Sequence, residues 1–189
     1  EQPFMVLATQ NPLEMDGTYP LPEAQLDRFL FKVHVPFPDR DELNEVLTRT
    51  TGAHFGEVAA VLDGPTIEKH RQRIRMVEAA SHVQDYAVRM LLATHPDGDG
   101  APEMVTRWVR YGASPRGVQA MLLGAKMRAA LAGRVHVAFE DIRDTAPAAL
   151  RHRVLLGFEG EAEGINPDQV VASVMAVVPE VVGDAAAAV

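Results

Sequence analysis

The sequence predicts a mainly α-helical protein, in which a helical bundle follows a remnant of an α/β core made of two strands and a short helix. Apolar runs typical of buried strands lie within the first 36 residues. From residue 38 onward, apolar residues recur at helical spacing behind capping residues. These observations divide the chain into a core remnant at residues 1–37, a helical domain at 38–182 and a tail at 183–189.

The core remnant contains two short apolar runs that predict strands. Residues 4–9 end at a turn signal, and residues 30–35 end before two prolines. Between them, residues 22–29 predict a short helix with a proline in its first turn. Two strands separated by one short helix cannot form a stable sheet alone, so we expect them to be the last two strands of an α/β core whose earlier part is absent. We then expect their exposed edges to pair with each other, swap between chains or aggregate.

Local start signals predict the first helices of the helical domain. Asp39 followed by Glu42 is a capping box, which predicts a helix to about residue 50. Thr66 is expected to cap the next helix, and apolar spacing predicts a third one over residues 83–91. Residues 95–102 then predict a loop.

The second half of the chain predicts four more helices. Residues 103–111 predict a short helix, and Ser114-Pro115 begins a helix that Gly133 ends. That helix is apolar almost all round, which places it at the centre of the bundle. Two further helices are expected, one over residues 139–151 and one over residues 168–178, the second preceded by the cap signal Asn166-Pro167.

The composition excludes several classes of function. With 18 Lys+Arg against 26 Asp+Glu, the formal net charge is -8, which disfavours nucleic acid as a partner. The chain has no cysteine, and no two histidines stand at helical ligand spacing, so we expect no metal site within it. No run is long enough to span a bilayer and no signal peptide is present, so no membrane role and a cytoplasmic location are expected.

Two polar residues near the N-terminus are suited to a phosphate. Asn11 follows a predicted buried strand, at the sheet edge where ligands of open α/β sheets bind. Its amide could bind a phosphate oxygen or orient a water molecule, although Asn11-Pro12 could simply be a turn. Arg28 ends the predicted short helix and offers a permanently charged fork to phosphate. The alternative for Arg28 is an ion pair with Asp27 or Glu23.

A third candidate lies at the start of the predicted central helix. In "GASPRG", Ser114 is expected to cap the helix, Pro115 to open it and Arg116 to occupy its second position. The guanidinium then coincides with the positive end of the helix dipole. This arrangement predicts an anion site.

Taken together, "ATQNP", "GTYPLPEAQLDRF", "PFPDRDEL", "GASPRG" and "GRVHVAFEDIRDTAPAALRHRV" resemble the MoxR family of AAA+ ATPases over nearly the whole chain. The resemblance implies that the bundle is the lid domain and that the remnant belongs to a P-loop ATPase core. It also implies that Asn11 is the sensor-1 residue, Arg28 an arginine finger acting in trans, and Arg116 the sensor-2 residue acting in cis. Glu23 lies in the same motif as Arg28, and Ser114 and Pro115 accompany Arg116.

The same resemblance implies a ring-forming, hexameric chaperone that uses ATP and Mg²⁺ to remodel or assemble partner complexes. A von Willebrand factor A domain protein or a client complex would be its partner. The chain contains no G-x-x-x-x-G-K-[ST] motif and no convincing Walker-B acidic pair, and residue 1 is Glu. We therefore expect the nucleotide cradle to lie upstream of residue 1, and this piece alone not to hydrolyse ATP.

Two other readings of the chain stay open at this point. It could be a stand-alone helical protein-binding module with no ATP role, or, less consistently with its acidic charge, a DNA-binding helical domain. Two basic runs, "HRQRIR" at residues 70–75 and "ALRHRV" at 149–154, are interpreted as solvated surface charge, with partner binding as the alternative.

Overall fold

The computed structural model describes residues 3–10, 21–52 and 58–182. Within them the chain is mainly helical, as predicted, and carries one small antiparallel sheet of two strands. The elements are α1 (Glu23–Leu26), α2 (Arg40–Thr51), α3 (Gly64–Arg75), α4 (Ser81–Leu92), α5 (Glu103–Trp108), β1 (Val109–Tyr111), α6 (Pro115–Leu131), α7 (Phe139–Leu150), β2 (Leu155–Leu156), α8 (Phe158–Ala162) and α9 (Pro167–Val177).

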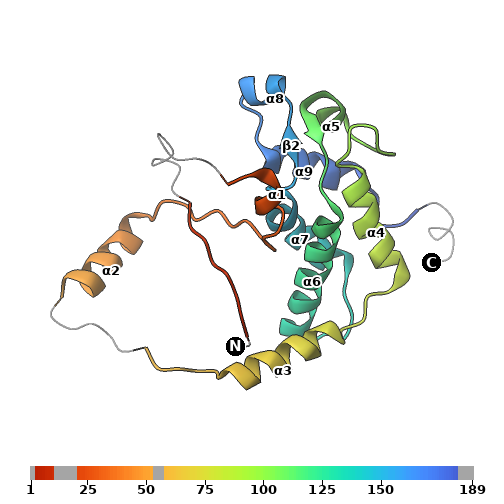
Figure 1. Cartoon of the computed structure of the whole chain (residues 1–189). Helices are drawn as coiled ribbons and strands as arrows, with labels where there is room; N and C mark the ends of the chain where they lie inside the picture. Colours follow the sequence, from red (N-terminus) through yellow and green to blue (C-terminus); the bar gives the residue numbers. More distant parts are fainter. Residues whose placement is uncertain (1–2, 11–20, 53–57, 183–189) are drawn as a thin grey trace.

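The core of the protein lies among α4, α6, α7 and α9 (Figure 1). The most extensive helix pairing is between α6 and α7, and α6 also packs on α3 and α4, so α6 is central, as its sequence predicts. The largest fully buried side chains are aliphatic or aromatic: Tyr86, Met90, Met121, Ile142, Leu150, Val105, Val170, Val171 and Val174, together with the polar Thr94 and Asp141. This bundle forms the stable body on which the site is built.

Helix α2 differs from the bundle because none of its residues is buried. Extended segments set it apart from the bundle (Figure 1). Its predicted capping box is confirmed: Asp39 Oδ1 accepts from the backbone N–H groups of Asp41 and Glu42 at 2.9 Å, and Glu42 Oε2 accepts from that of Asp39 at 2.9 Å. The cap therefore defines this helix locally, without help from packing.

Other predicted helix boundaries are confirmed by their capping contacts. The Ser114 hydroxyl accepts from the Arg116 backbone N–H at 3.3 Å at the start of α6. Gly133 lies directly after the end of α6 with φ 72°, a left-handed conformation that favours glycine. At α9, the Asn166 side chain accepts from the Asp168 N–H at 2.9 Å.

Two boundary predictions are wrong in detail. The cap of α3 is Asp63, which accepts from the Thr66 N–H at 2.9 Å, because a carboxylate three residues earlier outcompetes the Thr66 hydroxyl. The predicted helix 103–111 ends at Trp108, and β1 continues it because these residues pair with β2, which the sequence did not predict. Helix α8 was also missed.

The two predicted strands are the main correction to the fold. Neither residues 4–9 nor residues 30–35 form a strand, and the predicted pairing between them is absent. Apolar side chains of both runs are exposed, Val35 by as much as 88 %. A strand needs a neighbouring strand to hydrogen-bond its backbone N–H and C=O groups, whatever its side chains are. In the part of the chain described, neither run lies beside such a strand. Swapping between chains and aggregation stay predictions.

The division of the chain at residues 37 and 38 stays a prediction, and the tail at 183–189 lies outside the described residues. None of the helices described is both long and apolar enough to cross a bilayer.

Side chains from two other parts of the chain pack closely against Gly124 of α6. A Cβ at this position would lie 2.8 Å from Phe31 Cζ and 2.8 Å from Thr145 Cγ2, so any larger residue would force these side chains to move. Figure 1 shows the core-remnant segment approaching the bundle beside α1.

We predict that Gly124→Ala destabilises the protein by about 1–3 kcal/mol, because overpacking outweighs the gain in helix propensity. Denaturant-induced unfolding followed by circular dichroism measures the change. The control is Met127→Ala on the same helix, whose side chain is 43 % exposed and whose loss is expected to cost about 0.5 kcal/mol or less. A Gly124→Ala variant as stable as the wild type would contradict this packing argument.

Candidate functional site

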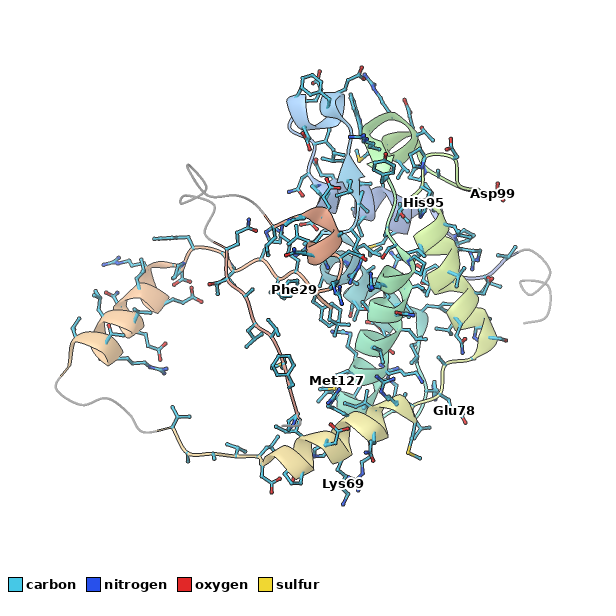
Figure 2. The ribbon with its side chains drawn as sticks, viewed as in Figure 1. Phe29, Lys69, Glu78, His95, Asp99 and Met127 are labelled. Carbon is cyan, nitrogen blue, oxygen red and sulfur yellow. The ribbon has the colours of Figure 1, made fainter. Side chains whose placement is uncertain are left out.

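The turn that leads into α6 is fixed by the loop after α4. Thr94 Oγ1 accepts from the Ala113 N–H at 2.9 Å, and the His95 ring Nε2 lies 3.0 Å from the Ala113 carbonyl oxygen. Gly112 packs directly against this ring, since a Cβ there would lie 2.5 Å from His95 Cγ. Figure 2 shows His95 at the end of α4. This support holds Ser114 and Arg116 at a defined place on the bundle.

The carboxylate of Asp27 occupies the anion site that the sequence predicts at the start of α6. Asp27 Oδ1 accepts from the Ser114 hydroxyl at 2.5 Å, and Oδ2 accepts from Arg116 Nη1 at 2.8 Å. The Arg116 side chain is 55 % exposed and that of Asp27 only 19 %. An acid of the same chain, 89 residues away from Arg116, therefore fills the predicted site.

Asp27 also pairs with a buried arginine that the sequence did not single out. Arg153 Nε donates to Asp27 Oδ1 at 3.1 Å, and the Arg153 side chain is only 2 % exposed. Burial alone would raise the pKa of the Asp27 carboxyl. The hydrogen bonds from Ser114 and Arg116 and the charge of Arg153 outweigh burial, so this pKa lies below its ordinary value of 3.8.

Arg153 binds the backbone on both sides of Arg28. Its Nη2 donates to the carbonyl oxygens of Asp27 at 2.9 Å and Phe29 at 2.6 Å. Its Nη1 donates to the Leu30 carbonyl at 3.2 Å and also to that of Ala149. Burial lowers the pKa of Arg153 but leaves a guanidinium, which five acceptors then satisfy.

The two residues before Arg153 hold the same segment. The Arg151 Nη1 donates to the Lys32 carbonyl at 3.1 Å, and its Nε donates to Asp168 at 2.8 Å. The His152 Nε2 donates to the Phe29 carbonyl at 3.0 Å. We call Arg151, His152 and Arg153 the clamp. Figure 2 shows Phe29 where the clamped segment lies against the bundle.

Burial disfavours the charged form of His152. Burial lowers its pKa below the ordinary value of 6.5, and the positive charges of Arg153 and Lys32 act in the same direction. With Nε2 donating, Nδ1 is a bare acceptor, and it has no hydrogen-bond partner among the described residues. Among the described residues, the His152 ring therefore holds the segment through one hydrogen bond only, from Nε2 to the Phe29 carbonyl.

A shallow cavity of about 220 Å³ lies beside these groups. Its lining includes Glu23, Asp27, Gly112, Ser114 and Arg153. The cavity thus joins the predicted motif around Glu23 to the turn before α6. No group of three or more His, Asp or Glu side chains suited to a metal ion occurs in the described part of the chain.

The structure brings some of the predicted site residues together. Ser114 caps α6 with Pro115 at its first position, and Arg116 meets Asp27. Glu23 lies at the same cavity. Asn11 falls outside the described residues.

The alternative for Arg28 is wrong. Its side chain is exposed and forms no ion pair with any described residue, because Arg116 and Arg153 bind the neighbouring Asp27. Arg28 therefore keeps its charge available.

The interpretation of residues 149–154 as surface charge is also wrong, because Arg153 and His152 are buried. One signal could have identified them: two basic residues at the end of an apolar helix, directly before another apolar run, are poorly placed for solvent. The run at residues 70–75 is confirmed as solvated charge on α3, where Arg71 pairs with Glu68.

Comparison with known protein families matches two regions of the chain. Residues 103–174 match the AAA lid domain, and residues 1–31 match the ATPase family associated with various cellular activities (AAA). The first match contains α6 and the clamp, and the second ends within the clamped segment. The Asp27 contacts therefore join the two matched regions.

Similar proteins cover nearly all of this chain. It is 36 % identical over 177 residues to Chaperone MoxR1 of Mycobacterium tuberculosis, covering 92 % of this chain and 46 % of that protein. It is 37 % identical over 183 residues to YeaC of Bacillus subtilis, covering 93 % and 52 %. The chain spans about half the length of these curated relatives.

A solved structure supports the arrangement of the fold. The crystal structure of a candidate ATPase from Cytophaga hutchinsonii superposes with a TM-score of 0.88 at 35 % identity, covering 95 % of this chain and 55 % of that one. The arrangement of bundle and N-terminal segment is therefore similar in a relative that is much longer than this chain.

We predict that Arg153→Met destabilises the protein by about 3–5 kcal/mol, since Asp27 and the clamped carbonyls lose a buried charged donor. Chemical denaturation measures the loss. Arg49→Met on α2 is the matched control, because that side chain is 75 % exposed and should contribute about 0.5 kcal/mol or less. Equal stabilities of the two variants would show that the clamp does not stabilise the fold.

The lowered pKa of Asp27 predicts an acid-dependent loss of stability. A carboxyl whose folded pKa lies below its unfolded value stabilises the fold fully above that unfolded value, here 3.8, and loses this contribution as the pH falls through the folded pKa. Unfolding free energies measured from pH 6 down to pH 2 should therefore fall less steeply below pH 4 in Asp27→Asn than in the wild type. Parallel curves would contradict the assignment.

Proposed function

Because the chain belongs to the MoxR family of AAA+ ATPases, we propose that it forms the lid and the adjoining arginine-finger segment of a ring ATPase. In this proposal ATP hydrolysis drives remodelling or assembly of partner protein complexes in the cytoplasm, in a chaperone-like role. One observation carries the proposal: Arg153 fixes the backbone on both sides of Arg28, while the Arg28 side chain stays exposed and unpaired among the described residues.

This geometry suits an arginine finger. A finger stabilises the charge that develops during phosphoryl transfer, and it is effective when its position is set before the nucleotide arrives. The clamp supplies that rigidity at Asp27 and Phe29, and the exposed guanidinium can reach beyond the surface of its own subunit. We propose that Arg28 acts in trans, which requires a ring, and that this ring is a hexamer.

The described residues fit the phosphate end of a nucleotide. Arg116 offers a half-exposed guanidinium at the start of a 17-residue helix, where anions are favoured. Nothing in the described part of the chain gathers the carboxylates that Mg²⁺ requires. The sequence also has no G-x-x-x-x-G-K-[ST] motif. We propose that ATP and Mg²⁺ are held largely by other parts of the protein, and that the bound nucleotide supplies the phosphoryl group for hydrolysis.

The remaining roles follow the same assignment. Arg116 acts as the sensor-2 residue, Asn11 as the sensor-1 residue that orients water, and Glu23 adjoins them at the cavity. The partner would be a von Willebrand factor A domain protein or a client complex. Asp27, next to Arg28 in sequence, pairs with Arg116, so the two candidate phosphate ligands belong to one end of the bundle.

We predict that this chain, joined to the upstream ATPase half of a MoxR-type relative, hydrolyses ATP. Arg28→Ala should then lower kcat by about 10³-fold or more, as expected for a lost arginine finger. Arg116→Ala should lower kcat/KM by about tenfold or more, since it removes a charge-assisted hydrogen bond to phosphate. Steady-state phosphate release measures both.

The control is Arg128→Ala, which removes a half-exposed arginine at the other end of α6. Rings that mix Arg28→Ala subunits with subunits defective in nucleotide binding would regain turnover only if Arg28 acts in trans. Normal hydrolysis by both Arg28→Ala and Arg116→Ala would instead favour the helical protein-binding module with no ATP role.

A further inference from the structure

The contacts of Asp27 divide cleanly between its two carboxylate oxygens. Oδ1 accepts from the buried Arg153 and from Ser114, whereas Oδ2 accepts from Arg116. The first group is part of the packed bundle. The Arg116 side chain is more than half exposed, whereas that of Arg153 is buried. Arg116 can therefore move away from Asp27 without unpacking the bundle.

We propose that Asp27 is the resting counter-ion of Arg116: its Oδ2 holds the guanidinium until a phosphate group takes that place. This inference rests on the proposed function, because it names the residue that positions the proposed sensor-2 arginine. Asp27 is a positioning residue here, since it acts on the phosphate only through Arg116.

The energetics allow the exchange. A half-exposed ion pair is worth about 1 kcal/mol or less, so Asp27 orients Arg116 without binding it tightly. A phosphate offers several charged acceptor oxygens to the same guanidinium and to the positive end of α6. After the exchange, Asp27 still keeps Arg153 and Ser114 as donors, so no buried charge is left unpaired.

Replacement of Asp27 by phosphate as the partner of Arg116 would also change the electrostatic surroundings of Arg28. Asp27 precedes Arg28 directly, and its carbonyl is bound by the same Arg153 that pairs with its carboxylate. Loss of Arg116 from Oδ2 therefore changes the charge balance one residue away from the proposed finger. Lid and finger would then respond to the same phosphate.

Asp27→Asn tests the proposal while keeping an acceptor for the two buried donors of the site. The amide oxygen can still accept from Arg153 and Ser114, but the amide NH₂ now faces Arg116 and cannot accept from it. We expect this variant of the 189-residue chain to bind inorganic pyrophosphate up to about fivefold more tightly than the wild type at low salt, because no resident carboxylate competes. Isothermal titration calorimetry measures the affinity, and Arg116→Gln in either background should abolish the gain.

The matched control is Asp144→Asn on α7, which removes the same charge from the partner of Arg128, an arginine on the same helix α6 as Arg116. If Asp27→Asn binds pyrophosphate no more tightly than Asp144→Asn, the counter-ion role is wrong. Circular dichroism checks that each variant is folded.

A measurement on the wild type is independent of any folding defect. Pyrophosphate at pH 7 should shift the ¹³C resonance of the Asp27 carboxyl and leave that of Asp144 in place, and an unmoved Asp27 resonance at saturation would overturn the proposal. A gain in pyrophosphate affinity without ATP turnover in the joined protein would sink the proposed function alone. Turnover that depends on Arg116 but an unchanged affinity in Asp27→Asn would sink this inference alone.

Discussion

The buried guanidinium of Arg153 is the interaction on which the functional end of this molecule depends. Four of its five hydrogen bonds reach a segment more than a hundred residues earlier in the chain, and the fifth binds the Ala149 carbonyl in α7. A buried charge is tolerated only when its donors are satisfied, and here one carboxylate and four carbonyls satisfy them. Since two of those carbonyls bracket Arg28, the same bonds that neutralise a buried charge also fix the backbone of the proposed finger.

The two arginines that meet Asp27 illustrate how burial decides the role of a charge. Arg153 is almost completely enclosed, so its pair with Asp27 is structural and costly to break. Arg116 contacts the other carboxylate oxygen from a half-exposed position, where solvent weakens the attraction. One aspartate can therefore hold two elements together permanently and still release one partner, because its two oxygens lie in different surroundings.

Features set by neighbouring residues could be predicted from the sequence, and features set by distant contacts could not. The capping box of α2 and the cap of α6 join residues two or three apart, so their residue types identify them. The residue types at the start of α6 predict an anion site at Arg116, but the carboxylate found there lies 89 positions away, and no local pattern indicates Asp27. Arg153 was taken for surface charge for the same reason. The two strand predictions were wrong because apolar, β-branched residues indicate that a segment tends to be buried, but they do not provide the neighbouring strand with which it must pair.

Residues on the N-terminal side of the prolines after residue 35 make direct contacts with the helical bundle. The clamp attaches residues up to Lys32 to α7, and the Lys32 N–H donates to the Ala148 carbonyl at 2.9 Å. Phe31 also packs against the bundle core beside Gly124. Any motion that keeps the bundle intact must therefore carry Arg28 with it. In the exposed run that follows, the His34 ring lies 4.0 Å from the Asp168 carboxylate, and α2 buries none of its residues. The segment that carries Arg28 is thus held against the helical bundle, although its sequence matches the AAA ATPase family.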